Sequence, residues 1–152
     1  NWNLKKQKNG LNALNAGENW KGSRKRMNDL DKIFSTYIRL RDADDNGYIR
    51  CYCCGYPVHW KLAHNGHFFS RRFLGIRFNE ENCHACCVPC NTYNNGNLKA
   101  YEEHLIREYG EGIIDKLTML KNTLTKLAPY EIEEMKVKYK QKVKELRKEK
   151  GL

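Results

Sequence analysis

The chain has 152 residues, and 28 Lys and Arg against 18 Asp and Glu give it a formal net charge of +10. One domain with a helical appendage fits this length, because domains usually have about 100–150 residues. Apolar residues make up 40% and charged residues 30%, which excludes a membrane-spanning helix of about 20 apolar residues. The composition also argues against a large dry core, so we expect something besides hydrophobic burial to hold the middle of the chain together.

The first part of the chain divides into two predicted segments. Residues 1–26 are basic and have few apolar side chains, which predicts a poorly ordered arm. From residue 27 onward, apolar side chains recur at helical spacing, which predicts an amphipathic helix of about four turns that ends in the turn cluster of residues 42–47. Residues 48–97 hold most of the Gly, Cys and aromatic residues, and short strands are predicted near residues 49–55 and 66–70.

The last third is predicted to be helical. One helix covers residues 98–109 and ends at Gly110, a second covers 112–127, and a third begins at Pro129 and runs to about residue 150. The predicted organisation is therefore an arm (1–26), a helix with a metal-stapled core (27–97) and a helical extension (98–152) in an α+β fold. The last helix is rich in Lys, and it either lies along a phosphate backbone or forms a solvated surface.

Seven cysteines lie between residues 51 and 90. An odd number, tight clustering and the lack of a recognisable export signal favour metal binding in a reducing compartment over disulfides. Two C-x2-C motifs, Cys51/Cys54 and Cys87/Cys90, match the ligand spacing of a tetrahedral four-cysteine zinc site, which contributes directly to folding free energy. Spacing alone leaves alternatives open, because Cys83-x2-Cys86 could be the second motif and Cys53 could replace a neighbour in the first.

Histidine and asparagine residues accompany these motifs. The order is C-x2-C, His67, Asn82, then C-x2-C followed directly by Asn91. This order resembles the HNH (His-Me finger) nucleases, in which a two-stranded ribbon and one helix surround a single catalytic metal ion and a four-cysteine zinc often ties the two together. The resemblance implies a small ββα-metal core flanked by an N-terminal helix and C-terminal helices, and it selects Cys87 and Cys90 as zinc ligands.

The resemblance also implies a role for each residue. His67 would be the general base, and a neutral imidazole suits proton abstraction near neutral pH. Asn82 would hold the ribbon loop and orient the histidine, and Asn91 would be a metal ligand at the start of the helix. One divalent ion, Mg²⁺ or Mn²⁺, would balance the charge that develops on the phosphate.

One branch of the HNH group is especially similar. The runs 63–71 (AHNGHFFSR), 74–82 (LGIRFNEEN), 87–91 (CVPCN) and Gly96-Asn97 resemble the NinG family (also called Rap), recombination nucleases of lambda-like phages. The similarity extends over roughly residues 28–150. It implies a structure-specific endodeoxyribonuclease that cuts branched DNA, such as Holliday junctions and D-loops, in the cytoplasm of a bacterial host.

Two positions depart from the family patterns. Gly66 stands where many HNH enzymes have a metal-binding Asp, and His64 stands where NinG-like sequences often have Asp. If His64 binds the catalytic metal together with Asn91, it supplies nitrogen where a carboxylate is common. Because Mg²⁺ prefers oxygen ligands, such a site would favour Mn²⁺ or a transition metal.

Basic residues suggest where DNA would bind, since a net positive charge attracts polyanions. Arginine guanidinium groups in the loop between His67 and Asn82 can make paired hydrogen bonds to phosphates, although a solvated loop fits the sequence nearly as well. The last helix offers a second basic surface. The candidate DNA-binding residues are Arg71, Arg72, Arg77, Lys140, Lys144 and Arg147.

Other interpretations stay open at this stage. A zinc-knuckle module could bind nucleic acid without cutting it, or the C-terminal helices could pair with another protein in a structural assembly factor. His84 could contact phosphate or metal, or it could be structural. A homodimer follows from the proposed function, because two opposed cuts need two active sites. Large side chains are predicted to form a small core around the zinc: Trp60, Phe68, Phe69, Phe73 and Phe78.

Overall fold

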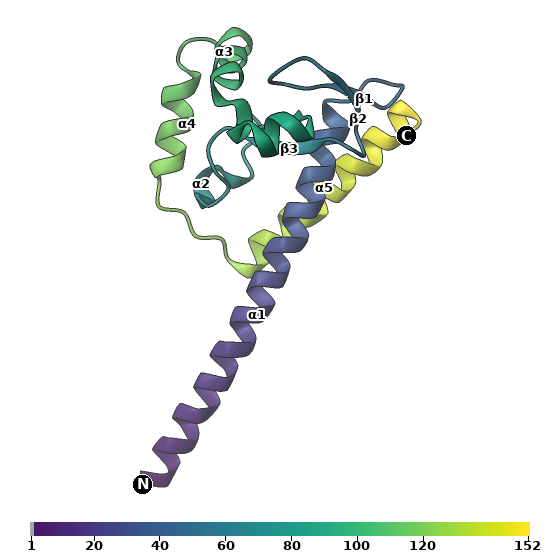
Figure 1. Ribbon diagram of the computed structural model, residues 1–152. Helices are drawn as coiled ribbons and strands as arrows, with labels where there is room; N and C mark the ends of the chain where they lie inside the picture. Colours follow the sequence, from purple (N-terminus) through teal and green to yellow (C-terminus); the bar gives the residue numbers. More distant parts are fainter. Residues whose placement is uncertain (1) are drawn as a thin grey trace.

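The computed structural model describes the backbone of residues 2–152 and the side chains from Gly22 onward. Its first element is a single 40-residue helix, α1 (Trp2–Arg41), whose N-terminal half projects away from the rest of the molecule (Figure 1). The predicted helix of residues 27–41 is therefore confirmed. The helix also continues back through residues 2–26, where the sequence predicts a poorly ordered arm, so the structure differs from that prediction in having helical backbone there. Asn1 lies outside the described residues.

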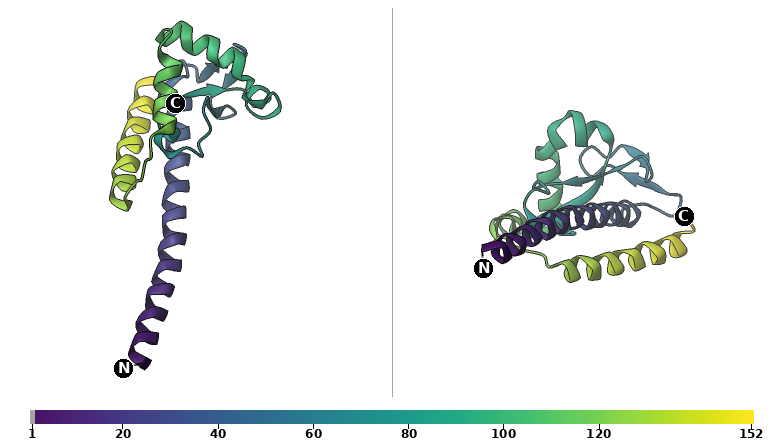
Figure 2. Two further views of the ribbon diagram at one scale, coloured as in Figure 1. Left: turned by 90° about the vertical axis from the view of Figure 1, so that its left-hand side faces the viewer. Right: turned by 90° about the horizontal axis from the view of Figure 1, so that it is seen from below.

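The C-terminal half of α1 packs along the last helix, α5 (Pro129–Lys150), and the two run side by side in both views of Figure 2. Phe34 of α1 meets Tyr139 of α5 edge-on, with ring centroids 4.9 Å apart. Helix α1 covers the apolar face of α5, so the side chains of that face belong to the hydrophobic core. We call these buried residues the helix-pair cluster: Leu30, Phe34, Tyr37, Ile38, Cys83, Ile132 and Tyr139.

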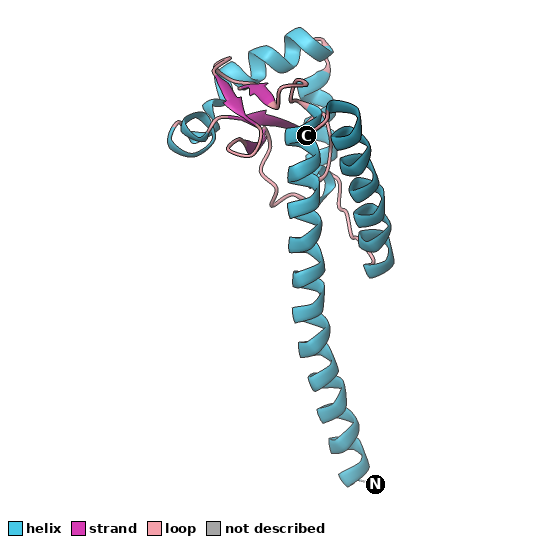
Figure 3. Ribbon diagram, turned by 90° about the vertical axis from the view of Figure 1, so that its right-hand side faces the viewer, coloured by secondary structure: helices cyan, strands magenta, loops and turns pink. Residues whose placement is uncertain are grey.

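Two antiparallel hairpins lie between these helices in the sequence and beside α1 in space (Figure 3). Strand β1 (Tyr48–Arg50) pairs with β2 (Pro57–His59), and the first cysteine motif lies in the connection between them. Strand β3 (His64–His67) pairs with β4 (Cys83–Cys86), so that His64 faces Cys86 and His67 faces Cys83. The long connection between β3 and β4 contains the short helix α2 (Leu74–Arg77).

After β4 the described chain is helical. A π-helical turn, η1 (Pro89–Tyr93), and a 3-10 turn, η2 (Asn95–Asn97), lead into α3 (Leu98–Tyr109) and α4 (Ile113–Asn122). Helix α3 has the predicted bounds, whereas α4 ends five residues earlier than predicted, with extended backbone at Thr123. The described elements thus form an α+β fold, and none of their helices is long and apolar enough to cross a membrane.

A second cluster, the sheet cluster, surrounds the cysteines. Its fully buried members come from the end of α1, from both hairpins and from α2, α3 and α4, and they include Ile49, Ile76, Tyr101, Leu105 and Leu117. Trp60 belongs to this cluster, and Phe68 and Phe69 pack against it, as predicted. The prediction fails for two residues: Phe73 is exposed, and Phe78 packs edge-on against Phe34 in the helix-pair cluster.

Candidate functional site

Four cysteines from the two C-x2-C motifs converge. The Sγ atoms of Cys51, Cys54, Cys87 and Cys90 all lie within 4.8 Å of one another, and those of Cys54 and Cys87 are 3.7 Å apart. Tetrahedral zinc with Zn–S bonds of about 2.3 Å places its sulfur ligands roughly 3.8 Å apart. The donor set and its spacing therefore fit a metal ion and are consistent with structural zinc. The first turn closes through Gly55, whose positive φ of 74° favours glycine.

The three other cysteines separate into two environments. Cys83 is fully buried in the helix-pair cluster, and its thiol belongs to neither group of converging thiols, so Cys83-x2-Cys86 is not the second metal motif. The thiols of Cys53 and Cys86 form a second group with the thiol of Cys51, which thus belongs to both groups.

His67 is the last residue of strand β3, and a hydrogen bond from one ring nitrogen fixes its side chain. Its Nε2 lies 3.0 Å from the carbonyl oxygen of Arg77. A carbonyl oxygen only accepts hydrogen bonds, so Nε2 carries the proton and a neutral ring has its lone pair on Nδ1. Burial lowers the pKa of His67 below its usual value, opposed in part by the backbone carbonyls of Arg77 and Asn65. The imidazole is accordingly neutral at neutral pH and able to accept a proton.

Asn82 ties together the connection between β3 and β4. Its side chain is fully buried, its Oδ1 accepts a hydrogen bond from the backbone N–H of Phe69 at 2.8 Å, and its Nδ2 donates to the Phe69 carbonyl at 3.0 Å. The backbone N–H of Phe68 donates to the Asn82 carbonyl at 2.9 Å. These bonds join the two ends of the connection between β3 and β4 directly after His67. Asn82 therefore fixes the segment that follows the histidine.

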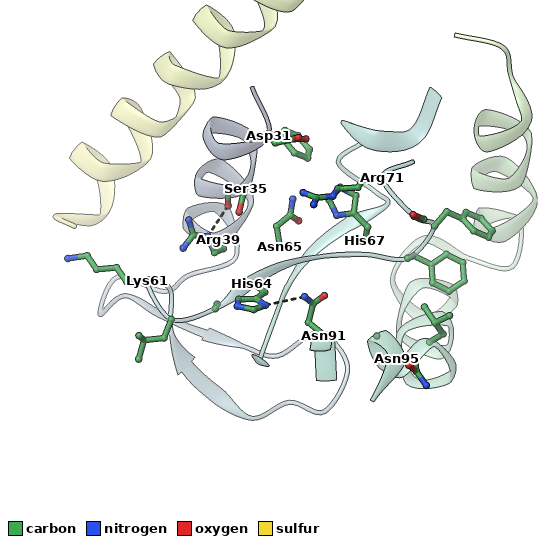
Figure 4. Close-up of a pocket in the computed structure, with 18 residues that line it drawn as sticks. Asp31, Ser35, Arg39, Lys61, His64, Asn65, His67, Arg71, Asn91 and Asn95 are labelled. Carbon is green, nitrogen blue, oxygen red and sulfur yellow. Dashed lines mark hydrogen bonds between the residues drawn. The ribbon is translucent and has the colours of Figure 1, made fainter. Parts of the chain in front are cut away.

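His64 and Asn91 meet across the site. His64 begins β3, Asn91 lies in η1 directly after Cys90, and the Asn91 side-chain amide nitrogen is 3.1 Å from His64 Nδ1 (Figure 4). The backbone N–H of Asn91 donates to the Cys87 carbonyl at 3.1 Å, so the second cysteine motif positions this asparagine. The two residues predicted to share a catalytic metal are thus in direct contact.

These residues line one open pocket of about 1090 Å³. His64, His67 and Asn91 all line it, and Figure 4 places Asp31, Ser35 and Arg39 of α1 along its opposite side. Buried Asn82 does not line the pocket, but its side chain holds the backbone of Phe69, which does.

Two basic residues of the pocket were missed in the sequence analysis. Arg39 donates to the carbonyl oxygen of Trp60 at 3.2 Å, and Lys61 lies 5.7 Å from the centroid of the Trp60 ring. Asp31, Ser35 and Arg39 recur every four residues on the face of α1 that lines the pocket. That polar stripe was the available signal in the sequence, because residues four apart share a helix face.

The predicted DNA-binding arginines differ in their surroundings. Arg71 is exposed and lines the pocket, and Arg72 is exposed beside it. Arg77 is instead paired with Asp31 of α1, with Nε 2.9 Å from Oδ1 and a second contact from Nη2 to Oδ2. Its guanidinium therefore joins the connection between β3 and β4, in which Arg77 lies, to α1.

The predicted DNA-binding residues of α5 lie outside this pocket. Lys140 and Lys144 are exposed along the helix. Arg147 lies 5.5 Å from the centroid of the Trp60 ring.

His84 has a structural environment. It is buried, its Nδ1 and Nε2 each lie 3.1 Å from a tyrosine hydroxyl, those of Tyr101 and Tyr109, and its ring stacks on Tyr52 at 3.7 Å. Burial lowers the pKa of His84 to about 3, helped by the positive charge of Arg41. The ring therefore stays neutral and holds β4 against α3.

Known proteins are similar to this chain in sequence. The family model described as "Bacteriophage Lambda NinG protein" matches residues 3–149. Protein ninG of Escherichia phage 933W and that of Escherichia phage lambda are each 32% identical over 115 residues, which is 74% of this chain and 54% and 53% of those proteins. Protein ninG of Salmonella phage P22 is 30% identical over the same length.

The chain spans about half the length of the curated relatives it matches. No solved structure matches it. The family model, by contrast, covers nearly all of the sequence, including both cysteine motifs, His67, Asn82 and Asn91. The chain therefore belongs to the NinG family of bacteriophage proteins.

Proposed function

We propose that the chain is a metal-dependent DNA endonuclease of the HNH type that acts in phage recombination. The observation that carries this proposal is the convergence of His64, His67 and Asn91 on one pocket, from strand β3 and from the helical turn that follows β4. A hairpin followed by a helical turn supports the ββα arrangement that the sequence resemblance implies. The four-cysteine group holds that turn in place and would carry the structural zinc.

A catalytic metal ion would lie between His64 and Asn91. Histidine nitrogen and amide oxygen are both metal ligands, and the two side chains are already 3.1 Å apart. Exchanging the amide nitrogen and oxygen of Asn91 would turn its oxygen toward the same point, an exchange that changes no heavy-atom position. A divalent ion bound there would stabilise negative charge on the phosphate and the leaving oxygen.

His67 would remove the proton from the attacking water. Its Nε2–H is committed to the Arg77 carbonyl, which leaves Nδ1 as the basic nitrogen. The low pKa keeps this nitrogen unprotonated at neutral pH. Asn82 would act as a positioning residue, since its bonds to Phe69 fix the chain directly after the histidine.

Positive side chains around the pocket favour a phosphodiester substrate. Arg39, Lys61 and Arg71 all line it, and arginine and lysine make most phosphate contacts in DNA complexes. The pocket is open and not a closed cavity, as a polymer substrate requires. We propose branched DNA, including Holliday junctions and D-loops, as the substrate in the bacterial host cytoplasm, with two copies of the chain making opposed cuts.

A cleavage panel tests this function. The purified chain is incubated with labelled duplex, single strand, flap, D-loop and four-way junction in Mg²⁺ and in Mn²⁺. We expect cuts that require the divalent ion and that are fastest on the branched substrates. A protein that binds the junction but cuts none of the substrates in either metal would instead be the non-catalytic zinc-knuckle module, and the endonuclease proposal would be wrong.

A further inference from the structure

We propose that Cys53 and Cys86, together with Cys51, form a second thiolate site that binds a second Zn²⁺ beside the four-cysteine site. The four-cysteine group uses Cys51, Cys54, Cys87 and Cys90, and a tetrahedral zinc ion has no position left for further ligands. Cys53 and Cys86 are therefore extra thiols next to a complete site. This inference is independent of the proposed endonuclease activity.

The spacing of the extra thiols is that of zinc ligands. The Sγ atoms of Cys51, Cys53 and Cys86 all lie within 4.8 Å of one another, and those of Cys53 and Cys86 are 3.7 Å apart. That separation equals the one between Cys54 and Cys87 in the first group, and it is close to the roughly 3.8 Å between thiolates on one tetrahedral zinc ion. Cys51 belongs to both groups, so its thiolate would bridge the two ions.

Local structure brings these thiols together. The backbone N–H of Tyr52 donates to the Ala85 carbonyl at 3.0 Å, which joins the turn of Cys53 to the end of β4 where Cys86 lies. On the paired strand β3, a Cβ atom added at Gly66 would lie 2.6 Å from the Cys86 Sγ. The absence of a side chain at Gly66 therefore provides the space that the Cys86 thiol occupies.

The turn η2, which contains Gly96 and Asn97, contacts both groups of thiols. The Cys53 thiol lies 3.5 Å from the Gly96 carbonyl oxygen, and the Asn97 side-chain amide lies 3.5 Å from the Cys90 Sγ. Three thiolates leave one tetrahedral position of the second ion, which water would fill.

Charge also permits a second ion. Six thiolates around two Zn²⁺ ions have the same net charge, −2, as four thiolates around one Zn²⁺. A second ion therefore adds no net charge to this half-buried region and removes two thiol protons from it.

The test is the zinc content of the whole chain. The protein is reconstituted with Zn²⁺ under reducing conditions, freed of unbound metal, and its zinc-to-protein ratio is measured by elemental mass spectrometry. We expect two zinc ions per chain in the wild type and one in Cys53→Ser and in Cys86→Ser. Cys83→Ala is the matched control, because Cys83 belongs to the helix-pair cluster, and it is expected to keep two.

Three results would overturn the proposal. A wild type with one zinc ion per chain would show that the second group of thiols does not bind zinc. A ratio of two that persists in both Cys53→Ser and Cys86→Ser would place the second ion elsewhere. A Cys53–Cys86 disulfide that persists under these reducing conditions, seen as an intact mass lower by two hydrogens with one zinc ion bound, would show that the two thiols pair with each other and do not bind zinc. A wild-type ratio of one overturns the proposal even if a variant fails to fold.

Discussion

The Nε2 atom of His67 lies 3.0 Å from the carbonyl oxygen of Arg77, and the guanidinium of the same arginine is paired with Asp31 on α1. Arg77 thus connects α1 to His67, because its guanidinium contacts Asp31 and its backbone carbonyl contacts the imidazole. The tautomer of His67 depends on where this carbonyl is held. We infer that α1 contributes to the site as a support for the ribbon loop.

Replacing Asp31 tests that support. Asp31→Asn leaves the charged Arg77 without its carboxylate partner in a mostly buried contact, so we expect a loss of about 1–3 kcal/mol in the free energy of unfolding. Cleavage by the variant should fall in kcat more than it rises in KM, because the change acts on His67 through Arg77 and leaves the proposed DNA-binding residues Arg71 and Arg72 in place. Urea unfolding and steady-state cleavage are the measurements.

Asp29→Asn is the matched control, since it removes the same charge from the same helix two residues earlier. If both variants lose equal stability and equal kcat, the Asp31–Arg77 pair has no special role in holding the loop.

Asn82→Ala should be strongly destabilising. The change leaves the backbone N–H and carbonyl of Phe69 without their buried side-chain partner, which costs about 1–3 kcal/mol in the free energy of unfolding. Denaturant unfolding of the metal-loaded protein measures this loss. The exposed Asn94→Ala should change stability by less than about 0.5 kcal/mol. An Asn82→Ala variant as stable as Asn94→Ala would contradict the assigned role.

Acid should destabilise the fold through His84. Its pKa is about 3 in the folded chain and about 6.5 when unfolded, so between these values the unfolded state binds one more proton than the folded state. Stability is therefore greatest above pH 6.5 and falls by about 1.4 kcal/mol for each pH unit below it.

His84→Gln removes this dependence, because glutamine does not titrate. The free energy of unfolding, measured from pH 7.5 to 5.5, should have a shallower slope in His84→Gln than in the wild type. His59→Gln serves as the control, since it removes a histidine that packs edge-on against Tyr48 at the other hairpin. Loss of metal at low pH affects all three proteins and cancels in the comparison. Equal slopes in wild type and His84→Gln would argue against a neutral buried His84.

Part of this structure could be predicted from the sequence because its causes are local. The two C-x2-C motifs predicted the group of four thiols, since each pair of ligands lies within one tight turn. Gly110 and Pro129 gave the end of α3 and the start of α5, as a glycine after a helix and a proline at its first turn usually do.

Other features depend on contacts between distant residues. Strand β4 (Cys83–Cys86) is buried at all four positions, so it has no alternation of polar and apolar residues to detect. Asp31 and Arg77 are 46 residues apart, and only the packed structure brings them together. For that reason the sequence suggested Arg77 as a phosphate ligand when its guanidinium is already paired.

We expect the metal preference of the proposed catalytic site to depend on His64. A nitrogen ligand favours Mn²⁺ over Mg²⁺, whereas a carboxylate at this position would favour Mg²⁺. We therefore expect His64→Asp to raise the ratio of the cleavage rate in Mg²⁺ to the rate in Mn²⁺ by about tenfold or more, the size of effect that changes around a metal site commonly produce. An unchanged ratio would remove His64 from the proposed metal site.

The most direct test of the central claim is the cleavage of a labelled four-way junction by His67→Ala. Zinc content and junction binding of the variant are measured in the same preparation, so that a loss of activity cannot come from a lost fold. We expect cleavage to fall by about 100-fold or more, the contribution of a general base, while zinc content and binding stay at the wild-type level. A folded, zinc-loaded His67→Ala that cuts the junction at the wild-type rate would contradict this claim.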